Sequence, residues 1–307
     1  MGTGVVAEDL VTGDTGVRLR VYRAAAADRR GEALLWIHGG GFVTGSLEMP
    51  ESDAVCAAIA DRGVTCVSVE YRLAPGFAKR RAQQAPGAVR FPLPLEDCEQ
   101  AWRWLLGHAE DLGADPDSLY VGGASAGGAL AATLALRMLH RAHGGHSTAD
   151  DAARDSRGGP TGRTGPQAPS GVALAYPFLH AALPPSGPDL RHALRGWRRL
   201  GTFTNRTVHW MAANYVGRGN LARLPEAFPG GRDLTGFPRT LIVNSERDTL
   251  RASGEGFAEE LKAHGRSVEV DCEPGTSHGH LNKPGTAAFD RTVTTITAWL
   301  TTGPGTP

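Results

Sequence analysis

The chain of 307 residues has little cysteine, no excess of charge of either sign and no long hydrophobic run. Its four cysteines are scattered without a CxxC pair, which argues against a metal site and a disulfide framework. Thirty-two basic residues balance 32 acidic ones, so no net positive charge is available for a nucleic-acid partner. The longest apolar stretch, 129–139, is interrupted by Thr133 and Arg137 and is too short to cross a membrane.

The first residues predict neither a secretory signal nor a myristoylation signal. Glu8 and Asp9 replace the basic stretch that precedes the apolar core of a secretory signal. Val6 stands where a myristoylation signal requires Ser or Thr. These features predict a soluble, cytoplasmic protein. A homodimer is compatible with the prediction, but the sequence does not decide the oligomeric state.

Short apolar runs alternate with helical patterns along most of the chain. A run that is apolar throughout, such as 33–37, suits a strand buried on both faces of a parallel sheet. The alternation predicts one α/β domain over residues 1–307, with a mostly parallel central sheet covered by helices on both faces. The expected strands are 17–22, 33–37, 64–69, 119–121, 172–175, 240–243 and 268–270, and the expected helices are 52–62, 95–106, 126–140, 205–216 and 254–264.

Three segments depart from this alternation. Residues 144–170 are rich in Gly, Asp, Ser, Pro and Arg without an apolar period, so we expect a long, mobile surface loop. Residues 75–90 form a second polar insertion. Residues 177–238 lie between two expected strands and contain the helix 205–216, which predicts a cap-like insertion over the sheet edge. The large apolar side chains of this insertion are interpreted as cap core rather than ligand contacts: Trp197, Trp210, Met211 and Tyr215.

The strongest motif is Gly123-Ala124-Ser125-Ala126-Gly127, which follows the strand 119–121 and opens a helix. This is the G-x-S-x-G nucleophile elbow in the context that it requires. The flanking glycines leave room for a serine with a strained backbone on a tight strand-to-helix turn. By itself the pentapeptide also fits a glycine-rich connection that binds a dinucleotide phosphate.

A second motif, His38-Gly39-Gly40-Gly41-Phe42, directly follows the strand 33–37. Three successive glycines let backbone N–H groups turn inward, and a carbonyl oxygen that becomes an oxyanion needs such preorganised donors. HGGG followed roughly 85 residues later by G-x-S-x-G is the combination found in lipases and esterases. The pair therefore favours a hydrolase.

A serine nucleophile needs a general base, and the base needs an orienting acid. In this fold the acid follows a late strand and the histidine follows the last one. Glu246 and Asp248 follow the strand 240–243, and His278 and His280 follow the strand 268–270. Position alone leaves both choices open.

From about Ala33 to Leu300 the chain resembles the bacterial hormone-sensitive-lipase-like carboxylesterases of the α/β-hydrolase fold. The resemblance rests on HGGGF (38–42), Glu70-Tyr71-Arg72-Leu73-Ala74-Pro75, the elbow with Gly128, Asp248-Thr249-Leu250-Arg251 and His278-Gly279. It implies the following site: Ser125 as the nucleophile, Asp248 as the acid, His278 as the base, and Gly40, Gly41 and Ala126 as oxyanion donors, with Gly39 in the same turn.

The chain also departs from this family. Ala124 stands where the elbow usually has an acid, and His280 replaces the Phe that usually follows His-Gly. Only 37 residues precede His38, which leaves room for a short N-terminal cap of little beyond two strands. We therefore expect residues 177–238 to form most of the roof of the acyl pocket, with residues 75–90 as a second candidate segment.

The predicted function is that of a serine hydrolase that cleaves small carboxylic esters through an acyl-enzyme intermediate. An acyltransferase, or another enzyme of specialised metabolism with the same site, is the alternative. A dinucleotide-binding protein is disfavoured because G-x-G-x-x-G is incomplete and the acid expected about 20 residues later falls on Gly144 and Gly145. No cofactor is therefore expected. A hydrolase fold without activity would lack a triad member, and none is missing.

Overall fold

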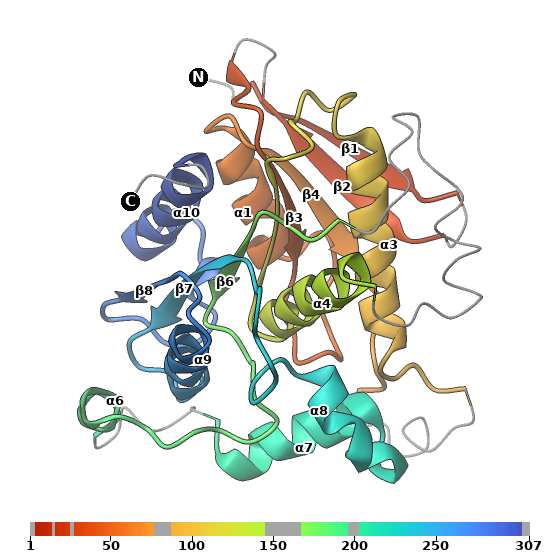
Figure 1. Ribbon diagram of the computed structural model, residues 1–307. Helices are drawn as coiled ribbons and strands as arrows, with labels where there is room; N and C mark the ends of the chain where they lie inside the picture. Colours follow the sequence, from red (N-terminus) through yellow and green to blue (C-terminus); the bar gives the residue numbers. More distant parts are fainter. Residues whose placement is uncertain are drawn as a thin grey trace.

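The computed structural model describes residues 4–13, 16–24, 28–76, 87–144, 167–195 and 203–302. Its centre is an eight-stranded sheet in the order β1-β2-β4-β3-β5-β6-β7-β8 (Figure 1). β1 and β2 are antiparallel to their neighbours, and every pair from β4 to β8 is parallel. The strands are β1 (Val6–Val11), β2 (Arg18–Arg23), β3 (Ala33–Ile37), β4 (Thr65–Glu70), β5 (Leu119–Ala124), β6 (Gly171–Ala175), β7 (Arg239–Ser245) and β8 (Val268–Glu273).

Helices cover both faces of the sheet, as the sequence predicts (Figure 1). Side chains alternate along the buried strand β3: Leu34 and Trp36 join the core beneath α1 and α10, whereas Leu35 and Ile37 join the core beneath α3, α4 and α9. This double burial explains why the strand is apolar at every position. The helices are α1 (Pro50–Ala60), α3 (Leu93–His108), α4 (Ala126–Ala142), α9 (Arg251–Ala263) and α10 (Ala287–Thr301).

The insertion between β6 and β7 contains α6 (Pro188–Ala193), α7 (Asn205–Val216), the 3-10 helix η3 (Arg218–Arg223) and α8 (Leu224–Ala227). Helix α7 has the predicted bounds, and the Thr204 side chain caps it by accepting a 3.1 Å hydrogen bond from the Thr207 amide. Met211 and Tyr215 are buried in the core, and Trp210 packs against it. Trp197 lies outside the described residues, as does the rest of 196–202.

Most of the expected loop 144–170, and residues 77–86 of the second insertion, also lie outside the described part of the chain. The described end of the loop is held in place. The Gln167 carbonyl accepts a 2.9 Å hydrogen bond from Trp102 Nε1 in α3, and its side-chain amide donates to the Pro116 carbonyl at 2.8 Å. Residues 167–170 therefore pack against the body of the protein.

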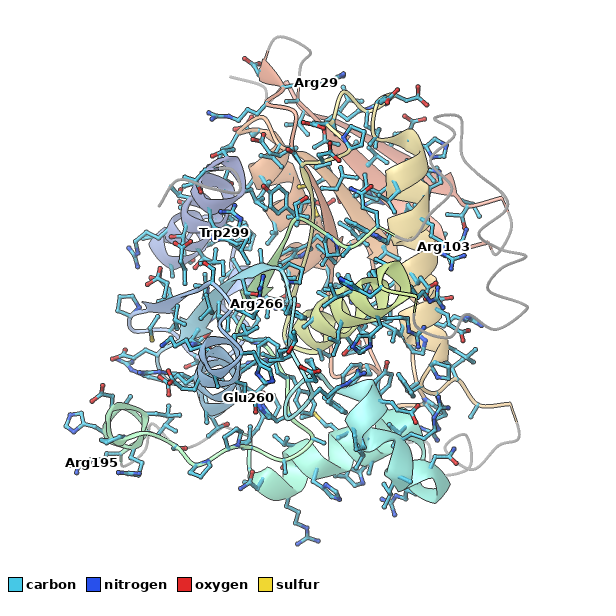
Figure 2. All side chains as sticks on the ribbon, in the orientation of Figure 1. Arg29, Arg103, Arg195, Glu260, Arg266 and Trp299 are labelled. Carbon is cyan, nitrogen blue, oxygen red and sulfur yellow. The ribbon has the colours of Figure 1, made fainter. Side chains whose placement is uncertain are left out.

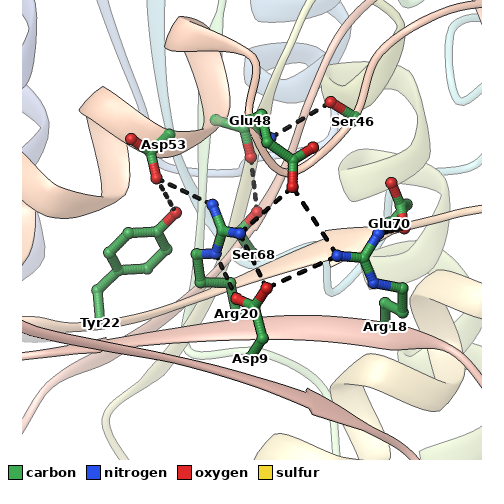
Figure 3. A network of polar contacts seen from close by, with 10 residues as sticks. Asp9, Arg18, Arg20, Tyr22, Ser46, Glu48, Asp53, Ser68 and Glu70 are labelled. Carbon is green, nitrogen blue, oxygen red and sulfur yellow. Dashed lines mark hydrogen bonds and ion pairs between the residues drawn. The ribbon is translucent and has the colours of Figure 1, made fainter.

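Strands β1 and β2 form the short N-terminal segment that the sequence predicts. Five of the six residues of β1 are exposed and Leu10 is only partly buried, so backbone pairing and surface charges hold the strand in place. Arg20 pairs with Asp9 in β1 at 2.9 Å and with Asp53 in α1 at 3.2 Å, while Arg18 pairs with Glu70 in β4 at 2.6 Å (Figure 3). These pairs connect the edge strand to the sheet and to the first helix.

The structure also shows the environment of Cys98 and bears on whether the chain contains a membrane-spanning helix. Cys98 is fully buried in the core beneath α3, and burial raises the pKa of its thiol. Within the described ranges, no helix has both the length and the apolar character needed to cross a lipid bilayer.

Candidate active site

The elbow places Ser125 between the end of β5 and the start of α4. Its φ of 53° lies in the region that favours glycine, a conformation that costs on the order of 1–3 kcal/mol. The flanking glycines make this turn possible: a Cβ on Gly123 would lie 2.6 Å from the Ile37 carbonyl oxygen, and one on Gly127 would lie 2.1 Å from the same atom. The tight turn explains the G-x-S-x-G spacing.

The turns that follow β7 and β8 bring an acid and a histidine to this serine. His278 Nε2 lies 2.9 Å from Ser125 Oγ, and His278 Nδ1 lies 2.6 Å from Asp248 Oδ2. Asp248 is only 1% exposed, and its Oδ1 accepts a 3.0 Å hydrogen bond from the Leu250 amide. The carboxylate therefore accepts from Nδ1, which leaves Nε2 free to accept the serine proton.

Glu246 and His280, the alternatives that sequence position leaves open, lie away from Ser125 and bond to other groups. Glu246 accepts a 2.6 Å hydrogen bond from the Gly275 amide and pairs with Arg247. His280 is buried between two hydroxyls, with Nδ1 2.8 Å from Ser245 Oγ and Nε2 2.9 Å from Thr292 Oγ1. The structure thus brings Asp248 and His278, and neither alternative, to Ser125.

The electrostatic environments of the two histidines differ. Burial lowers the pKa of His278, but the charge and hydrogen bond of Asp248, together with the charge of Glu51, raise it, and the balance lies above the ordinary value. Burial, followed by the neighbouring His278, lowers the pKa of His280 to about 4. His280 is therefore neutral near pH 7, whereas His278 binds a proton more readily than a free imidazole does.

The HGGG turn lies beside the elbow. Gly40 (φ 108°) and Gly41 (φ 60°) have backbone angles that favour glycine, and a Cβ on Gly40 would lie 1.9 Å from the Thr44 carbonyl oxygen. The Gly39 amide donates to Glu51 Oε1 at 2.7 Å, so it is engaged in the protein itself. The amides of Gly40, Gly41 and Ala126 have no hydrogen-bond partner in the described part of the chain. Three of the four predicted donors are therefore available to a ligand.

The Tyr-Arg-Leu-Ala-Pro motif packs against the HGGG turn. The Tyr71 hydroxyl donates to the carbonyls of His38 (3.0 Å) and Gly39 (3.2 Å), and its ring stacks on His38 at 4.4 Å. Arg72 pairs with the buried Asp97 of α3 at 2.7 Å. The motif therefore has a structural role that fixes the glycine turn against the helix layer.

The serine and histidine open into a cavity of about 700 Å³. Phe203 contacts His278 edge-on with ring centroids 4.9 Å apart, and Met211 of α7 also lines the cavity. The lining combines glycine backbone with largely apolar side chains: Gly40, Gly41, Val43, Thr44, Met49, Glu51, Gly76, Ser125, Phe178, Phe203, Met211, Leu250, His278, Gly279 and Asn282.

Three residues that the sequence does not predict for the site, Glu51, Tyr176 and Asn282, meet at this cavity, and Glu51 and Asn282 are part of its lining. Their only signal in the sequence is an acid in the first turn of the helix that follows HGGG, a position where an acid normally serves the helix dipole. The three residues come from segments far apart in the chain, and only the folded protein brings their side chains together.

A hydrogen-bonded Ser–His–Asp series at the carboxyl edge of a mostly parallel sheet, beside a glycine turn with available amides, defines the serine-hydrolase architecture of the α/β-hydrolases. Residues 34–282 match the family model described as alpha/beta hydrolase fold. The chain belongs to this family, and within it to the hormone-sensitive-lipase-like carboxylesterases that its motifs resemble.

Relatives and solved structures agree with this assignment. Ethyl acetate hydrolase of Pseudomonas putida is 30% identical over 268 residues, which cover 86% of this chain and 71% of that protein. Carboxylesterase NlhH of Mycobacterium tuberculosis is 30% identical over 273 residues, covering 88% and 73%. The structure of a Pyrobaculum calidifontis esterase superposes with a TM-score of 0.72 at 29% identity, covering 97% of this chain and 84% of that one. The chain is thus a carboxylesterase-type α/β-hydrolase.

Proposed function

We propose that this carboxylesterase cleaves small carboxylic esters through an acyl-enzyme intermediate on Ser125. The observation that carries the proposal is the continuous series of hydrogen bonds from Asp248 through His278 to Ser125, which ends in the cavity. A free serine hydroxyl is a poor nucleophile, and a histidine in hydrogen-bond contact supplies the missing base.

The geometry supports the following steps. His278 Nε2 takes the Ser125 proton as Oγ attacks the ester carbonyl, and Asp248 stabilises the imidazolium that forms. The carbonyl oxygen becomes an oxyanion that accepts hydrogen bonds from the amides of Gly40, Gly41 and Ala126. His278 then gives its proton to the leaving alcohol. A water molecule, deprotonated by His278, releases the carboxylic acid and restores the serine.

The substrate class is inferred from the cavity. A volume of about 700 Å³ lies within the range of pockets for small ligands. Phe178, Phe203 and Met211 offer an apolar wall to an acyl chain, and Leu250 extends it. The name of the Pseudomonas relative, an ethyl acetate hydrolase, supports a small neutral ester.

The test is hydrolysis of p-nitrophenyl esters from acetate to longer acyl chains by the wild-type protein and by Ser125→Ala. We expect hydrolysis by the wild type and a loss on the order of 10⁶-fold in kcat in the variant. A fluorophosphonate probe should label the wild type and the control Ser118→Ala, which lies outside the cavity lining, but not Ser125→Ala. Full activity of Ser125→Ala would refute the mechanism, and an ester product with an added alcohol would favour acyl transfer.

A further inference from the structure

Glu51 is a buried carboxylate in the first turn of α1 and lies in the wall of the cavity. It is 2% exposed. Three segments donate hydrogen bonds to it: the Gly39 amide reaches Oε1 at 2.7 Å, and the Tyr176 hydroxyl and Asn282 Nδ2 reach Oε2 at 2.6 and 3.0 Å. Both oxygens are therefore occupied by the protein itself, and Glu51 is not arranged as a substrate ligand.

Each donor belongs to a different part of the site. Gly39 begins the glycine turn whose next two residues, Gly40 and Gly41, line the cavity with amides that have no partner in the described part of the chain. Tyr176 follows β6, and its ring contacts His278 edge-on at 5.1 Å. Asn282 ends the 3-10 helix η4 (His280–Asn282), in the loop that carries His278. One carboxylate thus links the turn of the oxyanion donors to the loop of the base.

The fit around Gly39 shows how closely this link is built. A Cβ on Gly39 would lie 2.5 Å from Glu51 Oε1 and 3.1 Å from the Ala124 carbonyl oxygen. Only a residue without a side chain lets the carboxylate reach this amide. The first glycine of HGGG is therefore required by Glu51, whereas Gly40 is required by its own backbone angles.

The negative charge of Glu51 also acts on the site. A buried carboxylate is costly unless it is paired or fully hydrogen-bonded, and Glu51 has no ion pair with Lys or Arg in the described part of the chain. The groups that face His278 are Asp248 after β7, Glu51 in α1, Tyr176 after β6 and His280 in η4. Among them, Asp248 and Glu51 favour its protonated form.

We propose that Glu51 is a positioning residue of the active site, which holds the oxyanion turn and the histidine loop in register and stabilises the imidazolium of His278 by its charge. The inference rests on the proposed function, because it assigns Glu51 a role in the same reaction. It makes Glu51 a second carboxylate of the site, which acts through Gly39 and His278 and does not touch the substrate.

Two variants separate position from charge. Glu51→Gln keeps the length of the side chain and removes the charge, whereas Glu51→Asp keeps the charge and cannot reach all three donors. With p-nitrophenyl acetate, both should lower kcat by roughly 10- to 100-fold, the effect of small displacements in a site, with little change in KM. In Glu51→Gln the acidic limb of the pH profile should also move to lower pH, because one of the two charges that favour protonated His278 is gone. In Glu51→Asp the limb should stay near its wild-type place.

The matched control is Glu48→Gln, which removes an exposed carboxylate three residues earlier and should leave kcat and the limb unchanged. Tyr176→Phe and Asn282→Ala each remove one donor and provide the test if Glu51 variants do not fold. Their losses in kcat should be smaller and should not add to that of Glu51→Gln.

All rates are divided by the concentration of sites that a fluorophosphonate labels, so that misfolded protein does not count. A wild-type kcat per labelled site, together with a wild-type acidic limb in Glu51→Gln, would overturn the inference, as would additive losses with Tyr176→Phe. Failure of the wild-type protein to hydrolyse any ester would instead refute the proposed function, so the two failures are distinguishable.

Discussion

Asp248→Asn is the substitution whose effect the structure defines most sharply. Asp248 Oδ1 accepts from the Leu250 amide at 3.0 Å, and Oδ2 faces His278 Nδ1 at 2.6 Å. In the variant, the Leu250 amide should hold the carboxamide oxygen, so the NH₂ group takes the place of Oδ2 and points at Nδ1. Nδ1 must then accept a hydrogen bond, and the histidine proton moves to Nε2.

This change removes the base without disturbing the shape of the site. Nε2 lies 2.9 Å from Ser125 Oγ, and with a proton of its own it can no longer accept the one from serine. The wrong tautomer in a Ser–His–Asp triad costs about 10⁴-fold in kcat, which corresponds to about 5 kcal/mol in the barrier. The carboxamide is isosteric with the carboxylate, so the protein should remain folded.

The assay is steady-state hydrolysis of p-nitrophenyl acetate, with thermal unfolding followed by circular dichroism. Glu246→Gln is the matched control, because Glu246 is the other acid after β7 and its carboxylate serves the Gly275 amide. It should retain near wild-type kcat. The assigned role of Asp248 is refuted if folded Asp248→Asn keeps more than about a hundredth of the wild-type activity, or if Glu246→Gln loses as much activity as Asp248→Asn.

Two further predictions concern packing and pH. Gly127→Ala should lower the free energy of unfolding by about 2 kcal/mol or more, because its Cβ would lie 2.1 Å from a backbone oxygen that cannot move aside. The control Gly13→Ala has open space around the new Cβ and should be near neutral. Thermal melts of both variants test this. Wild-type kcat/KM should fall as the pH decreases through a value above about 6.5, because the pKa of His278 is raised and only the neutral imidazole accepts the Ser125 proton. An acidic limb well below this pH would contradict the environment assigned to His278.

Burial patterns explain which elements the sequence predicts. Strand β3 and helix α7 have the predicted bounds because each has an unambiguous apolar pattern. Helix α10 was not predicted, since its centre is rich in β-branched residues such as Thr292, Val293 and Ile296, which favour a strand locally. It is helical because residues on one of its faces, Phe289, Val293, Ile296 and Leu300, pack on the sheet.

The residues of the site also differ in whether the sequence alone predicts them. Ser125 and the glycines of the elbow and the HGGG turn can be predicted from the sequence, because the tight backbone of these two turns requires them. The choice between Asp248 and Glu246 depends on how the turn after β7 is folded, and local sequence does not contain that information. Glu51 is harder still: its three donors lie 12, 125 and 231 residues away in the chain, so only the assembled sheet brings them together.

The separation of the site residues along the chain also bears on how the enzyme matures. Ser125 and His278 are 153 residues apart, and β6 and β7 must both be in place before the last strand can dock beside them. During refolding, helices can form in microseconds, but a contact of this range waits for the closing of large loops. Ester cleavage therefore serves as a reporter of completed folding: its recovery should lag behind the return of helical signal, and a delayed activity phase would time the docking of the carboxyl half of the sheet.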